Sequence, residues 1–169
     1  IGMCSGRAVD SLRMIAADLP EIRYVVGGSG SAALRREGDG WVPLATRPLP
    51  DASIRRTLET ADKHGFEAWG FTPDAWIVER VTPKVETDIA ITGAQPTIAP
   101  LRETADIGKM LLLADTAEKL AHVEDLRGDP DLTIVVSGPG YIDIVHADSA
   151  ATKGGDFVLA DLGLSWSDA

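Results

Sequence analysis

The sequence of 169 residues has one cysteine, few aromatic residues and fewer basic than acidic residues. Its single cysteine, Cys4, excludes an internal disulfide framework and any zinc site built from several cysteines, and it suits a reducing cytoplasm. Lysine and arginine number 16 against 26 aspartates and glutamates, which gives a net charge of −10. Because nucleic acids and anionic membranes are polyanions, this charge predicts that neither is a partner.

Long apolar runs are also missing. The longest cover about five residues, whereas a membrane-crossing helix needs about 20, and no segment near the start resembles a signal peptide. We therefore predict a cytoplasmic protein without a membrane segment. The hydrophobic content of 44% is enough for a folded core. The chain opens at Ile1 rather than Met, so we expect the parent protein to begin further upstream.

The first third of the sequence has the pattern of a parallel sheet. Apolar side chains recur at helical spacing over residues 8–19. Short apolar segments at 1–4, expected to be the end of a buried strand, and at 24–26 flank this helix, and strand–helix–strand is typical of parallel pairing. A hairpin is expected next, because the turn residues 37–40 separate two further strand-like segments.

From residue 49 to residue 146 the pattern changes to helices and hairpins. The expected elements are a helix over 53–64, a hairpin of 66–71 and 75–81, a strand over 108–114, a helix over 116–126 and a hairpin of 132–136 and 141–146. Residues 82–100 contain three prolines and show no clear period. The hairpins indicate an antiparallel sheet with helices on one face. We predict an α/β fold in which this α+β module, residues 49–146, is inserted into a partial parallel core made of residues 1–48 and 147–169.

Two strand-to-helix junctions of the core carry residues that suit an anion. Ser5-Gly6-Arg7 follows the first strand, and backbone N–H groups at a helix start together with a small hydroxyl can bind phosphate. The plain alternative is that Ser5 caps the helix. Lys153 opens a later helix, where its charge opposes the helix dipole unless an anion compensates; an exposed lysine is the alternative. Both junctions belong to the edge of an α/β sheet at which ligands bind.

These junctions resemble motifs of haloacid-dehalogenase-type (HAD) phosphatases, in particular the Cof-type hydrolases of class IIB, which have a large cap. Residues 5–7 are similar to the second motif of that family, and residues 29–31 to its Asn-Gly-Ala turn. Residues 74–78 and 107–111 resemble strands of the cap, and residues 141–144, shortly before Lys153, resemble its return to the core. The resemblance covers nearly the whole chain and implies a Rossmann-like core with an inserted α+β cap.

The resemblance also implies an activity, that of a Mg²⁺-dependent phosphatase acting on small phosphorylated metabolites such as sugar phosphates through an aspartyl-phosphate. It assigns catalytic roles to Ser5 and Lys153, phosphate binding to Ser5, Gly6 and Lys153, and substrate binding to Arg7, Ser29 and Gly30. Trp76, Glu79 and Arg80 are candidates for substrate contacts from the cap. Holding the transferring phosphoryl group is an electrostatic task of the kind that dominates phosphoryl transfer.

The acidic motifs of the family are absent. The sequence has no Asp-x-Asp-Gly-Thr, and its one Asp-x-Asp, Asp129-Pro130-Asp131, is expected to form a solvated loop. The sequence therefore offers no nucleophile and no metal ligands. We expect both to lie outside this chain, and we predict that the 169 residues are a catalytically silent fragment of the parent enzyme.

Three other interpretations stay open on the sequence alone. Residues 28–33 match the dinucleotide loop G-x-G-x-x-A, although that fold needs a full helix next. Cys4 lies in a pattern similar to a nucleophile elbow and would need one of the three histidines as a base. A non-enzymatic alternative is a stand-alone α+β binding module, with Trp41, Trp69 and Trp76 on a partner surface rather than between sheet and helices.

Overall fold

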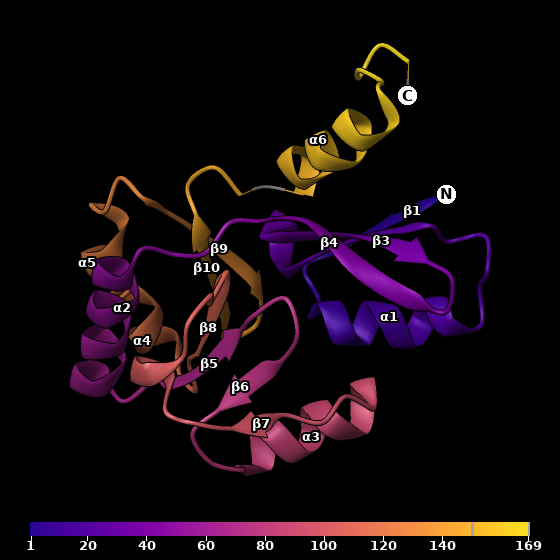
Figure 1. Ribbon diagram of the computed structural model, residues 1–169. Helices are drawn as coiled ribbons and strands as arrows, with labels where there is room; N and C mark the ends of the chain where they lie inside the picture. The colour runs from indigo at the N-terminus through magenta and orange to yellow at the C-terminus, as the bar shows by residue number, and fades with distance from the viewer. Residues whose placement is uncertain (150, 169) are drawn as a thin grey trace.

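The computed structural model describes residues 1–149 and 151–168, and the side chains of these residues except 117, 118 and 151–153. The chain forms two β-sheets, and it passes twice between them (Figure 1). These two crossings lie side by side, because the Arg47 guanidinium on the first donates a hydrogen bond of 2.7 Å to the carbonyl oxygen of Asp148 on the second. The segment between the crossings builds the whole larger sheet.

The smaller sheet has four strands in the order β1-β2-β3-β4, with β1 (Gly2–Cys4), β2 (Tyr24–Gly27), β3 (Ala32–Glu37) and β4 (Gly40–Thr46). β1 and β2 are parallel, and the other pairs are antiparallel. β1 lies at the edge of this sheet, and among the described residues it pairs only with β2. Ile1 is 78% exposed and Cys4 is exposed, so in this chain the first strand is not buried as expected.

Helices cover both faces of the smaller sheet, α1 (Val9–Ala17) on one and α6 (Ala151–Leu162) on the other (Figure 1). Successive side chains of β2 point to opposite faces, as in any strand. Val25 packs in a cluster with Leu12 of α1, whereas Val26 lies against Gly154 of α6. Val25 and Val26 thereby each pack against a helix, one on each face of the sheet.

The larger sheet has six strands in the order β7-β6-β5-β8-β10-β9. Its elements are β5 (Glu67–Phe71), β6 (Trp76–Val78), β7 (Thr97–Ile98), β8 (Lys109–Leu113), β9 (Leu132–Gly138) and β10 (Tyr141–His146), with helices α2 (Asp51–His64), α3 (Pro83–Thr92), α4 (Ala117–Ala121) and α5 (Glu124–Arg127) and a short turn at Leu101–Glu103. All pairs are antiparallel except β6 with β7.

The core of the larger sheet follows the alternation of β8. Met110 and Leu112 join the cluster formed with α2 and α5, whereas Leu111 packs on the opposite face with two tryptophans and with α3. These tryptophans, Trp69 and Trp76, are 1% and 2% exposed. They therefore pack between sheet and helix and do not form the exposed partner surface that the binding-module alternative placed on them. Trp41, the third tryptophan of that alternative, is partly buried against the cluster that includes Leu12.

Two segments differ from expectation. The helix expected over 116–126 is broken into α4 and α5, because the N–H groups of His122 and Val123 bond three residues back, which tightens the chain into a turn. The unclear stretch contains α3, which Thr82 caps by accepting a hydrogen bond from the Val85 N–H at 3.3 Å and which ends at Gly93 with φ of 72°.

The loop expected to be solvated is partly buried. Asp129 is 8% exposed and accepts a hydrogen bond of 3.0 Å from the Ser53 hydroxyl at the start of α2. Arg56 lies 3.5 Å from the same carboxylate oxygen. The expectation was wrong because burial of this carboxylate depends on α2, which is distant in sequence. Asp129 fastens the loop before β9 to that helix.

A pair of stacked histidines is expected to make stability depend on pH. The rings of His64 and His122 lie 3.8 Å apart and nearly parallel. Burial, then His122 and Lys63, lower the pKa of His64 below its ordinary value. Because the unfolded chain binds this proton more readily, stability is fully present above the unfolded pKa of about 6.5 and is lost as pH falls below it.

We therefore expect urea unfolding to show a loss of stability between pH 7.5 and pH 5.5 that His64→Gln reduces. Equal pH profiles for the original protein and His64→Gln would contradict this assignment. His122→Gln serves as a second variant, because it removes the stacking partner while leaving His64 itself in place.

Candidate functional site

Two loops meet at one end of the smaller sheet, the end at which the parallel strands β1 and β2 finish. β1 and β2 are parallel, so the residues after Cys4 and after Gly27 leave the sheet at the same end. The Ser5 N–H donates to the Val26 carbonyl at 2.9 Å, and the Ser29 N–H donates to the Ser5 carbonyl at 3.3 Å. A further bond of 2.8 Å joins the Gly28 N–H to the Arg7 carbonyl. Residues 5–7 and 28–30 therefore fix each other's backbone.

Ser5 is not the cap of α1. The cap position belongs to Ala8, whose side chain has no hydrogen-bonding group. The Ser5 hydroxyl instead accepts a hydrogen bond of 3.2 Å from the Arg7 N–H, which leaves its own proton available to a ligand. The start of α1 borders a cleft through Ala8 and Ser11. The helix-cap alternative is therefore wrong, and the Ser5 hydroxyl remains available to bind an anion.

The second loop is a single 3₁₀ turn, Gly28–Gly30, with left-handed backbone at all of its residues. Glycine adopts this conformation without penalty, but Ser29, with φ of 57°, does so only where its surroundings hold it. The turn leads directly into β3 without the helix that a dinucleotide loop requires. The dinucleotide interpretation is therefore wrong.

The start of α6 packs directly on this turn. A Cβ atom on Gly154 would lie 2.9 Å from Gly30 Cα, closer than real Cβ atoms come to a backbone. The segment around residue 153 thereby reaches the same end of the sheet as residues 5–7 and 28–30. The Lys153 side chain lies outside the described residues, so its expected role stays a prediction.

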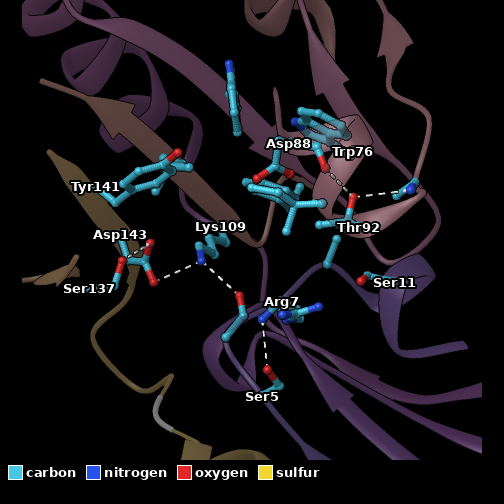
Figure 2. Close-up of a pocket in the computed structure, with 17 residues that line it drawn as sticks. Ser5, Arg7, Ser11, Trp76, Asp88, Thr92, Lys109, Ser137, Tyr141 and Asp143 are labelled. Carbon is cyan, nitrogen blue, oxygen red and sulfur yellow. Dashed lines mark hydrogen bonds and ion pairs between the residues drawn. The ribbon is translucent and has the colours of Figure 1, made fainter. Parts of the chain in front are cut away.

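A cleft of about 310 Å³ lies between the loop at residues 5–8 and the larger sheet. Its walls on the larger sheet are largely aromatic, formed by Trp69, Phe71, Trp76 and Tyr141 (Figure 2). Of the three cap contacts expected, Trp76 lines this cleft. Glu79 and Arg80 line a different hollow, where the Glu79 carboxylate accepts the Leu101 N–H at 3.2 Å.

Sequence reasoning missed the ion pair at the base of the cleft. Lys109 Nζ lies 2.9 Å from Asp143 Oδ2, with the two side chains 7% and 8% exposed. The same ammonium donates to the Gly6 carbonyl at 2.9 Å (Figure 2). A usable signal was present, because each residue is the charged member of an otherwise apolar strand segment, and buried charges are paired.

The other ionisable groups have distinct settings. Burial raises the pKa of the Asp88 carboxyl in the cleft, against the opposing charges of Arg7 and Lys109. Desolvation raises the pKa of the Cys4 thiol, which disfavours the thiolate that a nucleophile needs. His64 and His122 stack on each other, and His146 Nδ1 accepts the Asp148 N–H at 3.0 Å. These settings give no support to a Cys–His enzyme.

Within the described part of the chain, no three His, Cys, Asp or Glu side chains come together as metal ligands. Asp143, which accepts a hydrogen bond from Ser29 of the second loop, is already paired with Lys109. The residues described therefore do not fit the Mg²⁺ ion that the resemblance implied. In the same part of the chain, every helix is too short or too polar to cross a bilayer.

Comparison with known families decides the identity of the fold. The sequence profile of the haloacid dehalogenase-like hydrolases matches residues 1–168. The chain belongs to this family. No curated protein matches its sequence. The smaller sheet, which carries residues 5–7 and 28–30, is thus part of the core of a HAD fold. The six-stranded module is its cap.

Solved structures of the family share this fold at low sequence identity. A HAD phosphatase from Bacteroides thetaiotaomicron is 19% identical, with 99% of this chain and 61% of that one covered and a TM-score of 0.74. A HAD subclass IIB sugar phosphatase is 15% identical, with 98% and 63% covered and a TM-score of 0.78. A HAD-like hydrolase from B. subtilis is 14% identical, with 97% and 67% covered and a TM-score of 0.80. The chain spans 61–67% of the length of these structures.

Proposed function

We propose that this chain supplies the phosphate-binding edge and the cap of a phosphatase for small phosphorylated metabolites such as sugar phosphates. Residues 49–146 act as the cap, and residues 1–48 and 147–169 belong to the core. One observation supports this most strongly: residues 5–7, residues 28–30 and the start of α6 converge at one end of the smaller sheet, and residues 5–7 line the cleft.

Residues of the core bind the phosphoryl group in this proposal. The Ser5 hydroxyl donates to a phosphate oxygen, Gly6 lets the backbone approach it, and Lys153 neutralises it from the start of α6. Arg7 adds positive charge at the mouth of the cleft, which counteracts the repulsion of an anion by an acidic protein. Ser29 and Gly30 lie beside the substrate.

The cap binds the leaving group. Aromatic faces suit the apolar face of a sugar ring, and the Asp88 carboxyl offers an acceptor for hydroxyl protons. The Trp76 indole N–H, which is buried without a hydrogen-bond partner among the described residues, offers a donor. Hydrolysis through an aspartyl-phosphate needs a nucleophile and a Mg²⁺ site that these residues do not provide.

Loss of the Ser5 hydroxyl is expected to weaken phosphate binding. A hydrogen bond to a charged group is worth about 1.5–3 kcal/mol, so Ser5→Ala should reduce affinity for inorganic phosphate by about tenfold or more. ³¹P NMR titration of the 169-residue chain measures this. Ser167→Ala, on the exposed C-terminal turn, is the control and should bind as the original does. Unchanged binding by Ser5→Ala would overturn the assignment of Ser5.

A hydrolysis assay tests the rest of the proposal. With Mg²⁺ and p-nitrophenyl phosphate, the 169-residue chain should bind phosphate yet show background turnover, because it lacks the Asp-x-Asp-Gly-Thr motif. Clear Mg²⁺-dependent turnover would mean that another carboxylate attacks phosphorus. Absence of phosphate binding by the folded chain would reject the phosphatase proposal itself.

A further inference from the structure

The buried ion pair of the cap reaches across the cleft to both loops of the core. Lys109 and Asp143 lie on neighbouring strands, β8 and β10, where Lys109 pairs with Val145 and Asp143 projects from the same face two residues away. Lys109 Nζ lies 2.9 Å from the Asp143 carboxylate and donates to the Gly6 carbonyl at 2.9 Å. One cationic group thus links the cap sheet to the loop at residues 5–7 (Figure 2).

Asp143 makes the second connection. Its Oδ2 accepts from the Ser29 hydroxyl at 3.4 Å, and its Oδ1 accepts from the Ser137 hydroxyl of β9 at 3.1 Å. Ser29 is the one residue of the left-handed 28–30 turn that is not glycine, and for such a residue this conformation persists only where surrounding contacts hold it. The carboxylate therefore ties the turn to the cap at the residue whose backbone most needs support.

A role confined to the stability of the cap would not need these contacts. Lys119 shows what such a role looks like: its ammonium also pairs with a carboxylate, Asp115 at 3.0 Å, and donates to a carbonyl, that of Gly65 at 2.7 Å. All three residues lie within the cap. Lys109 has the same two kinds of partner, but its carbonyl belongs to the core.

We propose that Lys109, held by Asp143, is a positioning residue that fixes the Ser5–Arg7 loop from the cap side. The inference rests on the proposed function, since that loop is the one assigned to phosphate. The Gly6 carbonyl bonded to Lys109 belongs to the peptide whose N–H is that of Arg7, which in turn donates to the Ser5 hydroxyl. The ammonium thereby sets the plane of the peptide that orients the hydroxyl, and phosphate meets a formed site only with the cap docked.

The test compares Lys109→Met with Lys119→Met in the 169-residue chain, both confirmed as folded by circular dichroism. Lys109→Met should bind inorganic phosphate at least tenfold more weakly in ³¹P NMR titration, and Lys119→Met within twofold of the original. Lys109→Met should also shift the ¹H–¹⁵N resonances of Arg7 and Ser29 and speed their amide exchange, whereas Lys119→Met should not. Folded Lys109→Met with the original affinity and unchanged Arg7 and Ser29 amides would overturn the inference.

A double variant separates positioning from stability. Lys109→Met with Asp143→Leu replaces the pair by apolar side chains, so it should regain stability relative to a single replacement of Asp143 while phosphate binding stays at least tenfold weaker. Recovery of affinity along with stability would show that the pair only stabilises the fold. If the original chain binds no phosphate, the proposed function fails, and the Arg7 and Ser29 amides still decide whether Lys109 positions the loop.

Discussion

Asp143→Ala is expected to lower the free energy of unfolding by about 3–5 kcal/mol, because it leaves the buried ammonium of Lys109 without its counter-ion. Both side chains are less than a tenth exposed, so little water reaches the ammonium to replace the lost carboxylate. The Ser137 and Ser29 hydroxyls lose their acceptor as well. Urea unfolding followed by tryptophan fluorescence measures the loss, since Trp69 and Trp76 report on the cap sheet.

An exposed ion pair of the cap provides the control. Arg102 and Asp62 lie 2.6 Å apart, but their side chains are 46% and 75% exposed. Asp62→Ala should therefore change the free energy of unfolding by about 1 kcal/mol or less. Equal losses for Asp143→Ala and Asp62→Ala would mean that burial does not strengthen the Lys109–Asp143 pair.

Gly154→Ala is expected to lower the free energy of unfolding by about 1–3 kcal/mol and to weaken phosphate binding, because the added methyl group meets the backbone of Gly30. Backbone cannot give way as a side chain can, so α6 must move off the 28–30 turn. The loss should occur although alanine favours helix over glycine by about 1 kcal/mol. Thermal unfolding and ³¹P NMR titration together measure the two effects.

The neighbouring glycine is a matched control on the same helix. A Cβ on Gly155 would meet the end of the Trp166 side chain, which is 56% exposed and can move aside. Gly155→Ala should therefore be neutral or stabilising and should leave phosphate binding unchanged. Equal effects at both positions would place α6 elsewhere than on the 28–30 turn.

Local sequence patterns were enough to predict the elements whose hydrogen bonds join residues close together in the sequence. The hairpins of β3–β4 and β9–β10 and the helix α2 were predicted from turn residues and apolar spacing, because their hydrogen bonds are local. The start of α3 also carried a readable signal, the Thr82–Pro83 cap, in a stretch whose prolines obscured its period. The break between α4 and α5 has no equally clear sequence signal. It depends on Val123 turning into the buried cluster of the larger sheet, which is a tertiary contact.

The sequence by itself determined the family, the order of the elements and the residues that suit an anion, since short motifs keep their order along a chain. Only the tertiary structure decided that Asp129 is buried, that Ser5 is no helix cap, and that Lys109 and Asp143 join cap to core. The physical reason is distance along the chain. A charge is stabilised by whatever lies within a few ångströms of it, and Lys109 finds the carbonyl of Gly6 103 residues away.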